Sequence, residues 1–177
     1  MIQKTLFILF VVTGISINAQ SISQDYSIMR NVSLTNNHET DGDKTLLKAI
    51  KTADMLDMFE SEGPFTVFEP TSAAITNLPF EYRLKELIKP ENKQKLKNLI
   101  GYHIIKGNFK AKDLSGLVEQ NDGKATLETL NGSDLTLSLS YGNIKIEDYH
   151  GNFAIVKQHD INSSNGIVHV VDKVLIP

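Results

Sequence analysis

Five histidines are the side chains of this sequence best suited to acid–base chemistry or metal binding: His38, His103, His150, His159 and His169. None belongs to a His-Glu-x-x-His motif or to a comparable pair of closely spaced ligands. The nucleophile elbow Gly-x-Ser-x-Gly, the P-loop and the motif Gly-x-Gly-x-x-Gly are absent as well. A triad of distant residues stays open, because such groups meet only in the fold. The sequence predicts a non-enzymatic protein with no catalytic residue, metal site or cofactor.

The amino-acid composition excludes several classes of site and partner. The chain of 177 residues has no cysteine, which excludes a thiol nucleophile, a cysteine zinc site and a lipid-anchored cysteine. Its 18 basic and 21 acidic residues give a net charge of −3, and Arg30 and Arg83 are the only arginines. Nucleic-acid binding needs a basic patch or stripe, so no nucleic acid is expected as a partner. The 41% hydrophobic content and the length predict one globular domain.

The N-terminus has the layout of a secretory signal. Lys4 provides a positive charge, Leu6–Val12 is an unbroken apolar run, and Ala19 offers a cleavage position. The run is shorter than the ~20 residues that a spanning helix needs. Its place at the extreme terminus behind a basic residue favours a signal over a membrane anchor or a buried strand. We expect residues 1–19 to be a signal peptide. The mature protein then begins near Gln20 and is secreted, extracellular or periplasmic, and residues 20–43 form a polar arm that includes a first short helix.

Helical patterns dominate the first half of the remaining chain. Apolar residues at helical spacing predict an amphipathic helix over residues 44–60, which Gly63-Pro64 ends. The following expected elements are a strand over 65–68, short helices over 70–77 and 81–88, and a helix that starts at Pro90 and stops at Gly101.

Strand patterns dominate the second half. Leu135, Leu137 and Leu139 alternate with polar residues, which is typical of a strand with one buried face. Further strands are expected over residues 125–130, 144–146, 153–156 and 167–171, with a turn at 131–132 and a loop over 162–166. Helices followed by strands predict an α+β fold with an antiparallel sheet or sandwich.

Three segments in order carry a family resemblance. They are Gly63-Pro64-Phe65-Thr66-Val67-Phe68-Glu69-Pro70-Thr71, then Leu99-Ile100-Gly101-Tyr102-His103-Ile104-Ile105-Lys106-Gly107, and finally Asn165-Gly166-Ile167-Val168-His169-Val170-Val171-Asp172 with the residues up to Pro177. Together they resemble the signatures of the fasciclin domain family, and we assign the domain to residues 44–177. Glu69 and Ile75 depart from the pattern, since the family usually has alanine and phenylalanine there.

The resemblance implies a fold and a function. The expected fold is a wedge of two small β-sheets with several helices packed on it. The expected function is adhesion or binding of a cell-surface or matrix protein or glycan, and the family's receptor-contact positions correspond to Tyr102, His103, Asp160 and Ile161. A module that binds a glycan or a small apolar ligand is the alternative.

Structural roles compete with binding roles at the same positions. A half-buried histidine between a helix and a strand, such as His103, more often makes a structural hydrogen bond than contacts a partner. His169 alternates with valines and is expected in the core. Asp160 and Asp172 are expected to cap turns or pair with lysine, and Ile161 to be a core residue.

Overall fold

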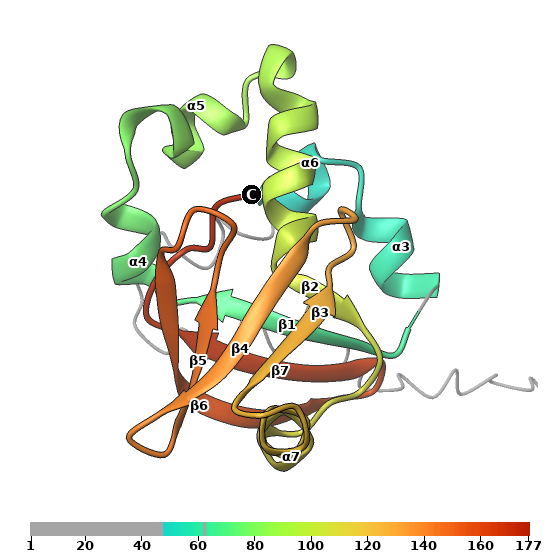
Figure 1. Cartoon of the computed structure of the whole chain (residues 1–177). Helices are drawn as coiled ribbons and strands as arrows, with labels where there is room; N and C mark the ends of the chain where they lie inside the picture. The colour runs from blue at the N-terminus through green and yellow to red at the C-terminus, as the bar shows by residue number, and fades with distance from the viewer. Residues whose placement is uncertain (1–47, 62) are drawn as a thin grey trace, which may run out of the picture.

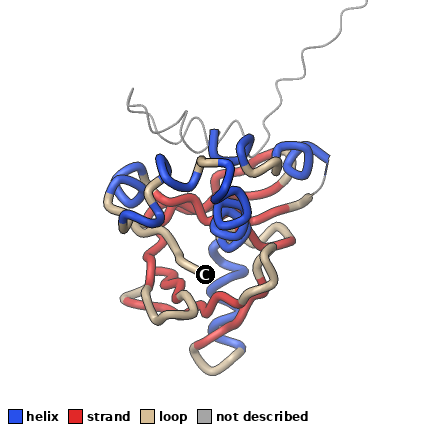
Figure 2. Tube along the Cα trace, turned by 90° about the horizontal axis from the view of Figure 1, so that it is seen from above, coloured by secondary structure: helices blue, strands red, loops and turns tan. Residues whose placement is uncertain are grey.

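The computed structural model describes residues 48–61 and 63–177 (Figure 1). The expected signal peptide and the polar arm with its short helix lie outside these residues. Most helices gather at one end of a β-sheet, and one helix lies at the opposite end (Figure 1). Seen from above, the helical segments spread over their end of the molecule while the strands continue beneath and beside them (Figure 2). The α+β class predicted from the sequence is confirmed.

Seven strands hydrogen-bond in the order β2-β1-β7-β6-β5-β4-β3. Their bounds are Phe65–Pro70 for β1, Ile104–Lys106 for β2, Lys124–Glu128 for β3, Asp134–Ser140 for β4, Asn143–Glu147 for β5, Phe153–Ser163 for β6 and Gly166–Val171 for β7. The pairing of β1 with β7 is parallel, from Phe65 opposite Gly166 to Pro70 opposite Val171. All other neighbours are antiparallel.

Strand β6 joins the two halves of this sheet. Its first residues pair with β5, whereas the stretch from Val156 to Ser163 pairs with β7. Register shifts between Val156 and Gln158 and between Gln158 and Ile161 bend the strand. The two expected sheets are therefore β2-β1-β7-β6 and β6-β5-β4-β3, which share β6. The loop expected over 162–166 is wrong, because β6 runs to Ser163 and β7 starts at Gly166.

The prediction of one continuous helix over residues 44–60 is wrong. A helix over residues 48–52 ends, and α3, Leu56–Ser61, begins after a short break. Asp54 has a φ of 51°, and the Asp54 and Met55 N–H groups donate to the carbonyls of Lys51 and Ile50, both at 3.1 Å. This is the Schellman closure of a helix end, with aspartate in the left-handed position where glycine is usual.

Short helices lead from β1 to α6. Thr71 caps α4, Ser72–Thr76, because its hydroxyl oxygen accepts from the Ala74 N–H at 3.2 Å. The expected helix over 81–88 is two pieces, η1 over Phe80–Tyr82 and α5 over Leu84–Leu87, separated by the extended backbone of Arg83. Pro90 opens the turn η2, Pro90–Asn92, directly before α6, Lys93–Tyr102.

Gly101 lies inside α6 and does not end it, contrary to the expectation. The helix continues to Tyr102. A Cβ atom at Gly101 would lie 3.3 Å from Asn131, which belongs to the turn between β3 and β4. Glycine at this position therefore lets the helix approach that turn closely.

Helix α7, Ala111–Gln120, has no counterpart in the sequence prediction. Its carboxylate at Asp113 accepts from the Lys110 N–H at 2.9 Å and so satisfies one free donor of the first turn. Only Leu114 and Val118 are fully buried on this helix. One apolar pair four residues apart is too weak a pattern to identify a helix of this length.

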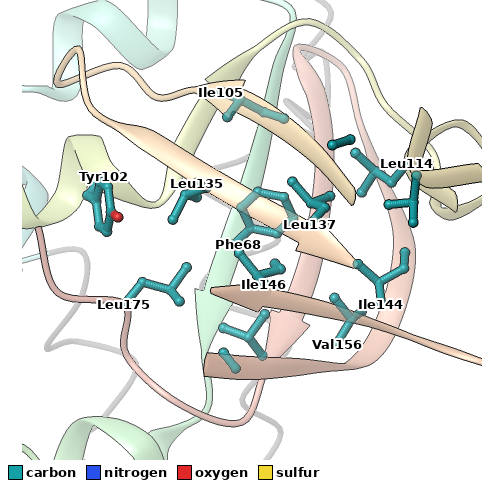
Figure 3. Close-up of a cluster of buried hydrophobic side chains, with 14 residues drawn as sticks. Phe68, Tyr102, Ile105, Leu114, Leu135, Leu137, Ile144, Ile146, Val156 and Leu175 are labelled. Carbon is teal, nitrogen blue, oxygen red and sulfur yellow. The ribbon is translucent and has the colours of Figure 1, made fainter. Parts of the chain in front are cut away.

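Two hydrophobic clusters form the core. The first lies between β1 and the helical end and includes Phe59, Leu87, Leu96 and Ile104. The second lies among the strands and α7, where Phe68, Leu114, Leu135, Leu137 and Ile146 point toward one another (Figure 3). Phe68 and Leu99 are buried in these clusters, as the sequence predicted, with 0% and 7% of their surface exposed.

Truncation of Phe68 should destabilise the protein strongly, because its ring fills the centre of the second cluster. We expect Phe68→Ala to lower the free energy of unfolding by about 3–5 kcal/mol in urea denaturation. Leu139→Ala is the matched control, since Leu139 is 38% exposed on β4 and should cost much less. Equal losses for both variants would contradict the assigned faces of these strands.

Candidate functional site

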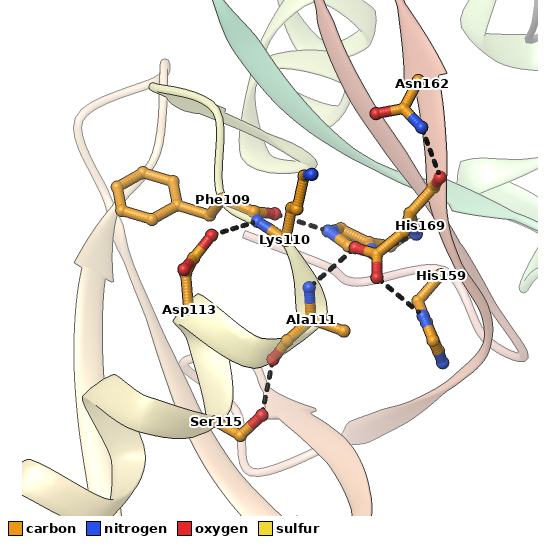
Figure 4. A network of polar contacts seen from close by, with 9 residues as sticks. Phe109, Lys110, Ala111, Asp113, Ser115, His159, Asn162 and His169 are labelled. Atoms are coloured by element: carbon orange, nitrogen blue, oxygen red, sulfur yellow. Dashed lines mark hydrogen bonds and ion pairs between the residues drawn. The ribbon is translucent and has the colours of Figure 1, made fainter.

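Asp160 lies at the bend of β6 and makes four hydrogen bonds, one of which its carbonyl accepts from the Asn162 side-chain amide at 3.3 Å. One carboxylate oxygen accepts from the Ala111 N–H at the start of α7 at 2.8 Å, and the other lies 3.0 Å from His159 Nδ1. The Asp160 N–H donates to His169 Nδ1 at 3.3 Å. Figure 4 shows this network between Ala111, His159 and His169. The carboxylate thus fastens the first turn of α7 to the sheet.

The backbone of Asp160 is in the left-handed region, with a φ of 61°. Aspartate tolerates this conformation better than most residues. Burial on its own would raise the pKa of Asp160, but the hydrogen bonds from the Ala111 N–H and from His159 outweigh it and hold the pKa below its usual value. The carboxylate therefore stays charged while it caps the helix.

His169 is fully buried next to this carboxylate. Because its Nδ1 accepts from the Asp160 N–H, its Nε2 carries the proton and donates to the Phe109 carbonyl at 2.8 Å. The ring stacks on Phe68, with 5.9 Å between ring centroids. Burial lowers the pKa of His169, so the neutral ring is favoured. The expected core position of this histidine is confirmed.

Ile161 follows Asp160 but has a different environment. It is half-buried, pairs with Val168 of β7 and packs against the first hydrophobic cluster. Asp160 and Ile161 therefore have structural partners within the domain. Their role in contacting a receptor stays a prediction.

Tyr102 is at the end of α6 and is fully buried. Its hydroxyl donates to the Asp134 carbonyl and accepts from the Tyr149 N–H, both at 3.0 Å. It thereby links α6 to β4 and to the turn after β5. Burial raises the pKa of the Tyr102 hydroxyl. This side chain presents no surface to a partner in the described structure.

His103 is buried beside Tyr102, with 6% of its surface exposed. Its Nε2 accepts from the Leu175 N–H at 3.0 Å, so its Nδ1 carries the proton and donates to the Leu99 carbonyl at 2.8 Å. Burial lowers the pKa of His103 to about 4. The ring therefore connects α6 to the C-terminal segment as a neutral group. The geometry gives both Tyr102 and His103 structural roles.

The two predicted residue pairs do not form one site. Tyr102 and His103 bond to β4, to the β5–β6 turn and to Leu175, whereas Asp160 bonds to the start of α7 and to β7. They share no hydrogen-bond partner among the described residues.

An open groove of about 710 Å³ lies between the end of α4, the β5–β6 turn and the C-terminal segment. Its lining is mixed, with Asn77, Pro79, Asn152, Phe153, Asp172 and Ile176 among its residues. These residues come from three separate stretches of sequence. The groove offers amide, carboxylate and aromatic groups to a molecule outside the domain.

Phe153 is the aromatic group of this groove, and 42% of its surface is exposed. The ammonium groups of Lys145 and Lys173 lie 4.7 and 4.5 Å from its ring centroid, which is cation–π distance. Lys145 also pairs with Glu147 at 3.0 Å. Aromatic side chains such as phenylalanine are enriched at protein interfaces.

A buried carboxylate fixes one rim of the groove. Asp148 accepts from the N–H groups of His150 and Asn152 at 2.9 Å, and from the Ile176 N–H at 3.2 Å. It thus holds the β5–β6 turn against the C-terminal segment. Tyr149 projects from this turn with 84% of its surface exposed. The rim is therefore shaped before any partner binds.

Sequence reasoning missed this groove, although one signal was present. Ala154 and Val156 are buried, as are Ile144 and Ile146, so the alternation places Phe153 and Lys145 on the outer face. The predicted pairing of Asp172 with lysine is confirmed by Lys157 at 3.1 Å. The meeting of Phe153 with Lys173 and α4 depends on the tertiary fold.

Within residues 48–61 and 63–177, no three His, Asp or Glu side chains are grouped so that they could hold a metal ion. Over the same residues, no helix combines the length and apolar character that crossing a membrane requires.

Comparison with known proteins identifies similar sequences. The fasciclin domain model matches residues 42–177. Protein sll1483 of Synechocystis is 35% identical over 133 residues, which are 75% of this chain and 66% of that protein. Human periostin and the rabbit transforming growth factor-beta-induced protein ig-h3 are each 30% identical. Their matches cover 75% and 76% of this chain but only 14% and 18% of those proteins.

A solved structure has the same fold. The FAS1 domain pair of the insect cell adhesion molecule Fasciclin I matches with a TM-score of 0.57 at 22% identity. The match covers 75% of this chain and 44% of that chain. This likeness supports the fold that the sequence resemblance implied.

His103 should make stability depend on pH. Its pKa is about 4 in the folded protein and about 6.5 in an unfolded chain, so the unfolded state binds the proton more readily. Stability from this group is present above pH ~6.5 and falls by about 3 kcal/mol as the pH drops to ~4. His103→Gln should lose less stability than the wild type over this range in urea titrations. Parallel curves for the two proteins would argue against a buried neutral histidine.

Asp160 should hold the start of α7 through its carboxylate. Asp160→Gly suits the positive φ but removes the acceptor of the Ala111 N–H, whereas Asp160→Asn keeps an acceptor oxygen. We expect the Ala111 amide to exchange its hydrogen about tenfold faster in the glycine variant, and less than that in the asparagine variant. Unchanged exchange in both variants would show that the contact contributes nothing to this helix end.

Proposed function

Because the chain belongs to the fasciclin domain family, we propose that it is a secreted, non-enzymatic module that binds a cell-surface or matrix component. The family assignment supports this, since the solved protein with the same fold is a cell adhesion molecule. The apolar run at Leu6–Val12 behind Lys4 supports export. The larger relatives contain much more than the matching unit, so their whole activities do not transfer with the domain.

The groove at Phe153 is the observation that carries the proposal. It combines an exposed aromatic ring, the cation of Lys173 and a rim that Asp148 holds in place, and Lys145 lies beside the same ring outside the lining. A fixed rim lowers the entropy cost of binding, because fewer groups become ordered in the complex. An aromatic ring with two lysine ammonium groups close by suits a partner that brings acidic or hydroxyl groups to an apolar surface.

The polar side chains of the interior support a binding role over catalysis. Histidines in active sites need a free ring nitrogen for proton transfer. Both ring nitrogens of His103 and of His169 are already engaged by the protein. Burial further lowers the pKa of both rings. These two histidines are therefore better suited to a structural role than to proton transfer.

Charge reversal in the groove tests the proposal. Lys173→Glu and Phe153→Thr should each reduce binding of the purified protein to cell-surface fractions at least tenfold, while the melting temperature stays within a few degrees of the wild type. Lys97→Glu is the matched control, because it makes the same charge change at an exposed residue of α6 outside the groove. Binding can be measured by surface plasmon resonance.

Treatment of the surface fraction identifies the class of partner. Loss of binding after protease treatment indicates a protein, whereas loss after periodate oxidation indicates a glycan. If the groove variants bind as well as Lys97→Glu and the wild type, the contact surface is not this groove. If the wild type binds no surface fraction, the adhesion role itself is wrong.

A further inference from the structure

A second cavity lies next to the groove and shares Leu78 and Val174 with its lining. It encloses about 80 Å³ between β1, α5, α6 and the helix over residues 48–52. Its buried wall includes Phe59, Leu87, Leu96 and Ile104, each with 1% of its surface exposed. The partly exposed side chains of Ile75, Tyr82, Leu84 and Val174 also line it. The cavity therefore has an apolar floor and reaches the surface between α4, η1 and α5.

The wall selects against anionic ligands. His103 lines the cavity, but both of its ring nitrogens already bond to Leu99 and Leu175. Glu69 adds a carboxyl group that is 1% exposed, and none of the described lining residues is lysine or arginine. An anionic ligand such as a fatty acid would find no cation here. A neutral apolar molecule meets mainly carbon atoms.

The size of the cavity fits such a molecule. A volume of about 80 Å³ exceeds the ~10–15 Å³ that one water molecule occupies on this measure, but a wall without open polar groups holds water poorly. An apolar ligand restores the dispersion contacts that the lining side chains lack across an empty space. In another protein, an engineered apolar cavity of about 150 Å³ stays dry and binds benzene or xenon.

The entrance is built from short helices. Helix α4 has five residues, and η1 and α5 have three and four. Their hydrogen bonds are largely local, such as Ile88 N–H to the Leu84 carbonyl at 2.9 Å and Thr76 hydroxyl to the Ser72 carbonyl at 2.9 Å. Helices this short have little stability of their own, so this segment can shift to admit a ligand at small cost.

We infer that this cavity is a binding site for a small neutral apolar molecule, or for the apolar end of a larger neutral one, which enters between α4 and α5. The site is separate from the groove at Phe153, because apart from Leu78 and Val174 the two linings differ. Occupation of the cavity fixes α4 and α5 against α6 and stabilises the helical end of the domain.

Titration of the full chain with benzene tests the site. Methyl NMR signals of Ile75, Leu84, Leu87 and Val174 should shift together and saturate, while the signal of exposed Leu139 stays unchanged. The melting temperature should rise with benzene concentration, because the ligand binds the folded state alone. Absence of saturable shifts at the cavity methyl groups would overturn the inference.

Two variants localise the binding. Ile75→Phe fills the entrance and should abolish the shifts at Leu87, whereas Leu139→Phe adds the same ring on the exposed face of β4 and should leave them intact. Leu87→Ala enlarges the floor and should bind benzene at least tenfold more tightly, even where its melting temperature is lower. Unchanged affinity in both Ile75→Phe and Leu87→Ala would exclude the cavity as the site. Cell-surface binding by Ile75→Phe should equal that of the wild type, so this test is independent of the adhesion proposal.

Discussion

Strand β6 has to pair with two different neighbours, and the rest of the domain is arranged around the way it does so. Its beginning belongs to the half-sheet with β5, and its end belongs to the half-sheet with β7. The register shifts before Ile161 and the left-handed backbone of Asp160 turn the strand between these partners. A bulge of this kind costs paired backbone groups, which must find other partners. The Asp160 N–H finds His169, and the side chain of Asp160 supports α7.

Other buried polar side chains also bind backbone groups where two elements of the fold meet. Tyr102 connects α6 with the turns around β4 and β5, His103 connects α6 with Leu175, and Asp148 connects the β5–β6 turn with Ile176. Each of these groups satisfies backbone donors or acceptors where regular pairing stops. An unsatisfied buried polar group costs about 1–3 kcal/mol, so such residues are constrained strongly. Polar residues such as Tyr102 and His103 therefore stand out in the sequence motifs because they connect separate helices and strands.

The sequence predicted those helices and strands whose apolar residues recur at regular helix or strand spacing. Leu135 and Leu137 alternate with polar neighbours, and β4 is found there. The break at Asp54 was not predictable in this way, because buried Ala53 and Met55 continue an apolar pattern across it. The end of β6 was read as a loop because its composition is rich in Asn and Ser, although pairing with β7 keeps it extended. Tertiary pairing overrides local propensity most easily in such short polar stretches.

The candidate site was less predictable than the fold, for a similar reason. Sequence motifs can mark Tyr102 and His103 as special, but only packing decides that both side chains face inward. The groove depends on residues 77–79, 151–153 and 172–176, which no single motif spans. Alternation alone does place Phe153 and Lys145 outward, so half of this surface could have been predicted. The arrival of Lys173 beside the same ring could not.

The groove and the internal cavity differ in how binding would be obtained. One rim of the groove is held by Asp148, and a partner gains affinity there because little order has to be imposed on that rim. The cavity is closed by short helices with local hydrogen bonds, so a ligand there must be admitted by movement of α4 and α5. The same fold therefore combines a fixed β5–β6 turn with helices α4 and α5 that can move. The β5–β6 turn is fastened by a buried carboxylate, whereas the segment after Thr71 rests mainly on apolar contacts with the first hydrophobic cluster. Hydrogen bonds are directional, so they fix the position of the β5–β6 turn. Hydrophobic contacts are not directional, so they allow the segment after Thr71 to rearrange.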